Sequence, residues 1–108
     1  MYYMNTASLI TDAKARFSHN SAKAYLKDKF SSKLIVAEQG GLWTASPALI
    51  SFLSVQTPFT IDDNVIVIDN FDNPVQVDGK ALLKKLQDTY NTVMNEWHAE
   101  WASLESKR

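Results

Sequence analysis

One short segment near the C-terminal end contains residue types that could bind a metal ion. Glu96, His98 and Glu100 lie close together in the sequence, and carboxylate and imidazole groups are common metal ligands. Glu96 and Glu100 are four residues apart and would share one face of a helix, whereas His98 is two residues from each and falls on the opposite side. The spacing favours a polar helix surface, and we predict no metal-binding residues.

The acidic segment of residues 69–73 has the composition of a calcium-binding loop. An EF-hand loop needs an oxygen ligand at its third position and a glutamate at its twelfth. Phe71 and Lys80 occupy those two positions. Aspartate, asparagine and the following Pro74 are typical turn residues, so the segment predicts a turn between two strands.

No arrangement of residues marks a catalytic centre. The chain has no cysteine, which removes cysteine nucleophiles, cysteine-ligated zinc and disulfides. Gly40-Gly41 lacks the spacing of a phosphate-binding loop, and no serine lies in a GxSxG motif. We therefore predict that the protein is not an enzyme and uses no cofactor. A signal peptide and a membrane-spanning segment are also missing from the sequence, which predicts a cytoplasmic protein that does not enter a membrane.

Charge is distributed unevenly along the chain. Residues 1–33 carry six bases against two acids, a net charge of +4, whereas residues 34–79 carry six acids and no base. Arg16, Lys23 and Lys27 fall near one face of a predicted helix and are candidates for contact with nucleic-acid phosphates. No base-stacking motif accompanies them in the sequence, so a solvated face, or one paired with acidic residues of another subunit, is the alternative.

The elements that carry these residues predict an α+β protein of one domain, residues 1–108. Apolar residues at intervals of four predict a helix over about 6–30, with a possible break at His19-Asn20-Ser21. Residues 33–39 and 42–45 flank Gly40-Gly41 and predict a hairpin. Residues 64–69 and 75–77 predict a second hairpin, and the first of these strands is apolar on both faces, which predicts a central position.

The segment after Ser46-Pro47 allows two interpretations. Serine as N-cap followed by proline favours a helix, but residues 48–55 are also apolar and short enough for a buried strand. The sequence therefore predicts an antiparallel sheet of four or five strands. With five strands, the strand count is similar to that of small Sm-like or SH3-like barrels.

The last thirty residues give the clearest pattern. Residues 79–108 contain no proline and no glycine after Gly79, and apolar residues recur at intervals of three or four, which predicts a helix about 42 Å long that Asp78 caps. A compact domain of this size is about 34 Å across, so we expect the helix to extend beyond it. Trp97 and Trp101 would either fold back on the first helix or cover a neighbouring subunit.

Residues 69–77, Leu82-Leu83 and the later Tyr90-Asn91, Met94-Asn95 and Trp97 resemble small proteins encoded by tailed bacteriophages. The resemblance covers most of residues 33–101 and includes Gly40-Gly41-Leu42-Trp43. It implies a protein of the host cytoplasm or the virion.

The patterns together favour an oligomeric structural or scaffolding protein, with a small nucleic-acid-binding module as the alternative. A protein partner that covers Trp97 and Trp101 is also compatible with the sequence. The residues that we expect to make the self-contact are Leu83, Leu86, Tyr90, Val93, Met94, Trp97, Trp101 and Leu104.

Overall fold

The computed structural model describes the backbone of residues 6–106 and the side chains of residues 18–106. Its elements are α1 (Thr6–Lys33), β1 (Ile35–Glu38), β2 (Gly41–Thr44), α2 (Pro47–Gln56), the short 3-10 helices η1 (Thr57–Phe59) and η2 (Ile61–Asp63), β3 (Asn64–Ile68), β4 (Pro74–Asp78) and α3 (Gly79–Ser106). The predicted α+β class is confirmed.

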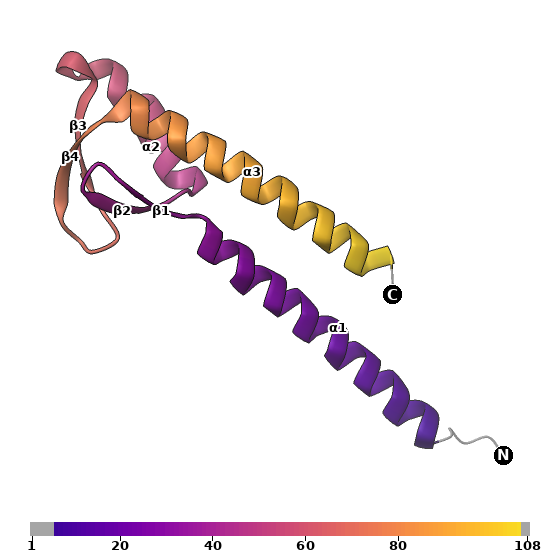
Figure 1. Ribbon diagram of the computed structural model, residues 1–108. Helices are drawn as coiled ribbons and strands as arrows, with labels where there is room; N and C mark the ends of the chain where they lie inside the picture. The colour runs from indigo at the N-terminus through magenta and orange to yellow at the C-terminus, as the bar shows by residue number, and fades with distance from the viewer. Residues whose placement is uncertain (1–5, 107–108) are drawn as a thin grey trace.

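The elements form two regions that share α3 (Figure 1). The head, residues 34–90, contains the strands, α2 and the first part of α3. The arm consists of α1 and the antiparallel second part of α3, residues 91–106. The molecule measures 77 × 25 × 22 Å and its radius of gyration is 20.9 Å, against roughly 13 Å for a compact domain of about 100 residues. The arm accounts for this elongation.

The first predicted hairpin is confirmed, with its turn one residue earlier than expected. Glu38 pairs with Gly41, so the two-residue loop is Gln39-Gly40, and both residues have positive φ, 49° and 79°. Positive φ at both positions suits the twist of a tight hairpin. Gly41 lies in β2, where a Cβ atom would be only 2.5 Å from the Trp43 indole. The close approach of this indole therefore requires a glycine at this position of the strand.

The second hairpin pairs β3 with β4, but it does not join the first hairpin in one sheet. Within residues 6–106 the strands form two separate two-stranded antiparallel sheets, so no barrel closes. The predicted central position of β3 is wrong: Val65 and Val67 are buried, whereas Ile66 and Ile68 face outward. β3 has β4 on one side only, because the link to β2 runs through the turn residues after β3.

The segment after Ser46-Pro47 is helix α2, so the alternative of a fifth strand is excluded. The Ser46 hydroxyl accepts a hydrogen bond from the Leu49 amide at 3.2 Å, which satisfies a donor that the first helical turn leaves unpaired. Pro47 opens the helix, where its fixed φ is favourable. α2 contributes Leu53 to the core.

The two long helices frame the molecule. α1 is unbroken from Thr6 to Lys33, which confirms the predicted helix and excludes the alternative of a break at residues 19–21. The predicted cap of α3 is confirmed, because the Asp78 carboxylate accepts a hydrogen bond from the Ala81 amide at 3.1 Å. Across residues 6–106, no helix combines the length and the apolar character that a membrane crossing requires.

The core of the head forms where β2, α2, β3, β4 and α3 converge. Its largest fully buried side chains are Trp43, Leu53, Leu82, Leu86 and Val77. The Trp43 indole donates a hydrogen bond to the Glu38 carbonyl at 2.8 Å, so its polar atom is satisfied inside the core. Leu34 packs against this core and also against the apolar cluster of the arm, which consists of Leu26, Phe30 and Val93.

Candidate self-association surface

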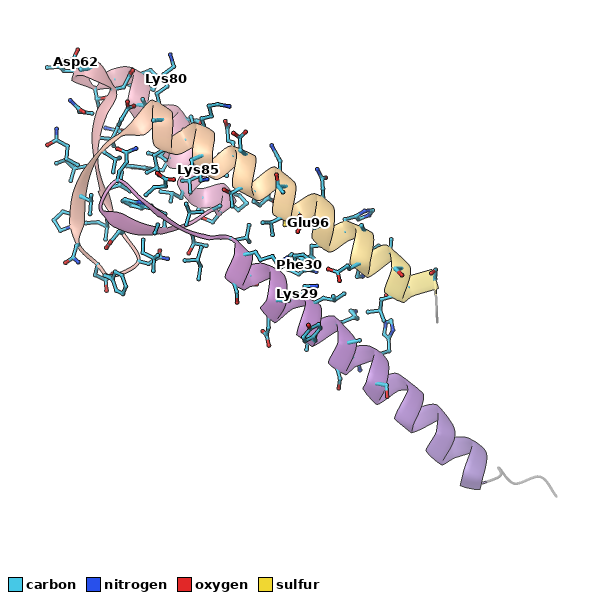
Figure 2. All side chains as sticks on the ribbon, viewed as in Figure 1. Lys29, Phe30, Asp62, Lys80, Lys85 and Glu96 are labelled. Carbon is cyan, nitrogen blue, oxygen red and sulfur yellow. The ribbon has the colours of Figure 1, made fainter. Side chains whose placement is uncertain are left out.

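The arm is held together by one apolar seam. The Phe30 ring of α1 stacks on the Trp97 indole of α3, with centroids 6.0 Å apart and planes 12° from parallel. Figure 2 shows Phe30 pointing from α1 toward α3. Leu26 and Val93 are buried beside this pair. Residues four apart lie on the same face of a helix, so Leu26 and Phe30 of α1 meet Val93 and Trp97 of α3.

Ion pairs run along one side of the seam. The Lys29 ammonium lies 3.0 Å and 3.1 Å from the two carboxylate oxygens of Glu100, and Lys33 lies 3.5 Å from Glu96. His19 Nε2 lies 3.3 Å from Glu105 at the far end of α3. The hydrogen bond to Glu100 raises the pKa of Lys29. The equal four-residue spacing of Lys29 and Lys33 in α1 and of Glu96 and Glu100 in α3 was a signal for this pairing that the sequence analysis missed.

The eight residues predicted for self-contact divide into two groups. Leu86 and Val93 are buried inside the protomer, and Leu83, Tyr90, Trp97 and Leu104 pack against its two apolar clusters. These six side chains stabilise the protomer itself, because α1 and the head cover the face of α3 that carries them. The remaining predicted residues are the half-buried Met94 and Trp101, which is exposed at 41%.

A shallow groove of about 270 Å³ lies on the arm beside Trp101. Its lining side chains are Lys23, Ala24, Leu26, Lys27, Trp97 and Trp101. Among the side chains of residues 18–106, neither Lys23 nor Lys27 has an acidic partner. The groove therefore combines an apolar floor with two unpaired positive charges. The side chain of Arg16, the third predicted basic residue, lies outside the described part.

The polar side chains of residues 96–100 do not converge on one point. Glu96 and Glu100 face α1 and pair with Lys33 and Lys29, so they belong to the arm seam and do not form the purely solvated surface that we predicted. His98 lies against Trp101, with ring centroids 5.7 Å apart. Within the described residues, no group of three potential metal ligands comes together.

The hydrogen bonds of Asp69 confirm the turn that we predicted for residues 69–73. One of its carboxylate oxygens accepts hydrogen bonds from the amides of Phe71 and Asn73, at 2.9 Å and 3.0 Å. The other accepts from the Leu42 amide of β2 at 3.3 Å. These bonds, that of Asn73 above all, lower the pKa of Asp69. Asp69 therefore joins the two hairpins and has no free oxygen directed at a ligand.

The head exposes apolar side chains in two places that the sequence analysis did not identify. The tip between α2 and β3, residues 59–63, carries Phe59 and Ile61, which are 83% and 85% exposed. The outer face of β3 and its turn carries Ile66, Ile68 and Phe71, all exposed. Isolated exposed apolar residues are ordinary, but clusters of them mark interaction surfaces.

Comparison with known proteins does not assign this chain to a family. No protein-family model, curated protein or solved structure matches the chain.

Proposed function

We propose that the protein is a non-enzymatic structural or scaffolding protein whose copies join through the arm. The observation that carries this proposal is the narrow seam of the arm. Among the arm side chains from Ser18 onward, only Leu26, Phe30 and Val93 are buried. Two large aromatic residues remain exposed, Tyr25 at 64% and Trp101 at 41%.

A pair of helices buries one stripe of each helix and leaves the other faces in water. Stable helical assemblies commonly add further helices, as in four-helix bundles. Aromatic residues and methionine are enriched at protein contacts, and the arm exposes Tyr25 and Trp101. A second copy of the chain packed on the arm would cover these side chains, which supports self-association.

The unequal lengths of the paired helices support the same proposal. His19 lies opposite Glu105, next to the last residue of α3, whereas α1 begins at Thr6. Residues 6–18 of α1 therefore continue past the end of α3 (Figure 1), over about 20 Å at 1.5 Å per residue. The backbone of this overhang is long enough to meet a helix of a second copy.

The proposed setting is the host cytoplasm or the virion of a tailed bacteriophage. It rests on the resemblance of residues 33–101 to small phage proteins.

The test compares two aromatic residues of nearly equal exposure, Trp101 in the arm and Phe52 in the head, at 41% and 44%. Light scattering after size exclusion should give a mass that is a multiple of 12.2 kDa for the wild type. Trp101→Ala should raise the dissociation constant by about tenfold or more, as for a central aromatic contact, whereas Phe52→Ala should leave it unchanged. A wild type of 12.2 kDa at all concentrations up to hundreds of micromolar contradicts the proposal.

The groove favours nucleic-acid binding as a second candidate function. The sequence showed no stacking residue beside the basic residues, but folding brings Trp97 and Trp101 next to Lys23 and Lys27. Single-strand binding sites combine aromatic stacking with positive charge. Titration of a thymidine oligonucleotide at low salt should quench the indole fluorescence, with an affinity that falls steeply as salt rises. No quenching at low salt removes this candidate.

A further inference from the structure

The tip of the head combines exposed apolar groups, negative charge and unusual backbone geometry. Phe59 and Ile61 are almost fully exposed, and Asp62 and Asp63 follow them directly. Both aspartates have positive φ, 55° and 59°, a region in which non-glycine residues are uncommon. Within the described residues, neither carboxylate has a cationic partner. Among the described residues, the carboxylates of the tip therefore have no cationic partner, and its two apolar side chains are largely exposed.

The groove on the arm has the complementary chemistry. Its floor is apolar, formed by Leu26, Trp97 and Trp101, and its unpaired charges are the ammonium groups of Lys23 and Lys27. Two apolar side chains followed by two carboxylates on the tip match an apolar floor beside two ammonium groups. Such matching of opposite charges steers association and sets the orientation of the partners.

We propose that the tip of one copy docks in the arm groove of a second copy. The inference rests on the proposed self-association and names the surfaces that meet. The contact must form between copies, because Asp62 lies at the far end of the head and Lys29, two residues from Lys27, lies in the arm (Figure 2). Phe59 and Ile61 contact the indoles, and Asp62 and Asp63 pair with Lys23 and Lys27.

The docking determines how two copies are arranged. If each tip occupies the groove of the other copy, a two-fold axis relates the copies, and the assembly closes as a dimer. Each head then lies beside the arm of its partner, and the two arms run antiparallel. The two identical contacts form together, so their contributions to affinity reinforce each other.

A carbodiimide cross-linking experiment tests which surfaces meet. The reagent joins ammonium and carboxylate groups that are in direct contact. Cross-links between Lys23 or Lys27 and Asp62 or Asp63 should appear in the dimer band of the full-length chain. Mixing isotope-labelled with unlabelled chain should show that each link joins two different copies. A dimer band in which these residues are never linked overturns the docking.

Charge inversion tests the energetic role of the same residues. Lys23→Glu with Lys27→Glu, and separately Asp62→Lys with Asp63→Lys, should each raise the dissociation constant by about tenfold or more, because like charges then face each other. Mixing the two variants should restore wild-type affinity through a mixed dimer. The control for the lysine inversion, Lys80→Glu with Lys85→Glu, makes the same change in net charge on exposed residues of α3 and should not weaken the dimer.

The outcomes separate this inference from the function on which it rests. A monomeric wild type overturns both. A multimer that neither inversion weakens overturns the docking and leaves self-association through the arm intact. Loss of oligonucleotide binding in the Lys23 and Lys27 variant, with an unchanged dimer, also overturns the docking and assigns the groove to nucleic acid.

Discussion

The head and the arm share α3 but bury it in different ways. In the head, α3 lies against α2 and the second hairpin, and Leu82 and Leu86 are enclosed on several sides. In the arm, the described part of the same helix packs mainly against α1, and its indoles range from the half-buried Trp97 to the exposed Trp101. One continuous apolar stripe is therefore fully buried at one end and only partly buried at the other.

This difference identifies the region that can open locally while the rest of the molecule stays folded. Local opening has the lowest free energy where few apolar side chains are buried. The arm has three buried side chains among its described residues, and its ion pairs are partly exposed, where solvent screening keeps the contribution of each pair small. We therefore expect the head to be the stable unit and the arm to open locally.

The largest expected effect comes from the core of the head. Trp43→Ala should lower the free energy of unfolding by about 3–5 kcal/mol, because a fully buried tryptophan leaves a cavity. The whole chain should lose helix content in urea at a lower concentration, as measured by circular dichroism. If the arm helices persist after the head unfolds, the head is not the unit that supports the arm.

The seam of the arm gives a smaller and more local effect. Phe30→Ala should cost about 3 kcal/mol, at the low end for a buried phenylalanine, because the half-buried Trp97 can move into the space. Hydrogen exchange should accelerate in α1 and in residues 91–106, with little change at β3 and β4. Equal acceleration in the head would show that the two regions open together.

Close packing in the head can be tested at Gly79. A Cβ atom here would collide with the Thr57 side chain and lie 2.8 Å from Val65 Cγ2. Gly79→Ala should therefore destabilise the head by about 1–3 kcal/mol, although alanine favours helix. Thermal unfolding measures the loss. An unchanged or raised melting temperature would mean that Thr57 and Val65 move away from residue 79 at little cost in free energy.

The smallest expected effects are changes in the stability of the head and of the arm with pH, which differ in direction between the two regions. The lowered pKa of Asp69 stabilises the head above about pH 3.8, and this contribution disappears as the pH falls through the pKa of the folded state. The raised pKa of Lys29 stabilises the arm below about pH 10.5, and this contribution disappears as the pH rises through the higher folded value. Hydrogen exchange should therefore show acid opening in the head and alkaline opening in the arm.

Two matched variants check the assignment of these pH responses. Asp69→Asn should remove the acid response of the head, and Lys29→Met should remove the alkaline response of the arm. An acid response that persists in Asp69→Asn would assign it to other carboxylates.

Local signals predicted most of the elements. Ser46-Pro47 favoured the start of a helix, with a strand as the open alternative, whereas Asp78 indicated the start of α3 and the composition of residues 69–73 indicated a turn. Each of these features depends on contacts within a few residues, which the sequence displays directly.

Features that depend on distant contacts were not predicted. The run of β-branched residues in β3 indicated a strand but could not show that the hairpins form separate sheets, because that depends on contacts between residues far apart in the sequence. The acidic tip and the arm groove lie far apart in the sequence, and only the fold reveals their complementary chemistry. The burial of Leu86 and Val93 likewise follows from the elements that cover α3.

The central claim is that another copy completes the arm, whereas the core of the head is complete in one copy. Hydrogen exchange on the full-length chain at low and high protein concentration tests this most directly. The account predicts that protection of α1 and of residues 91–106 rises with concentration while protection of β3, β4 and α2 stays constant. Protection of the arm that is independent of concentration would contradict it.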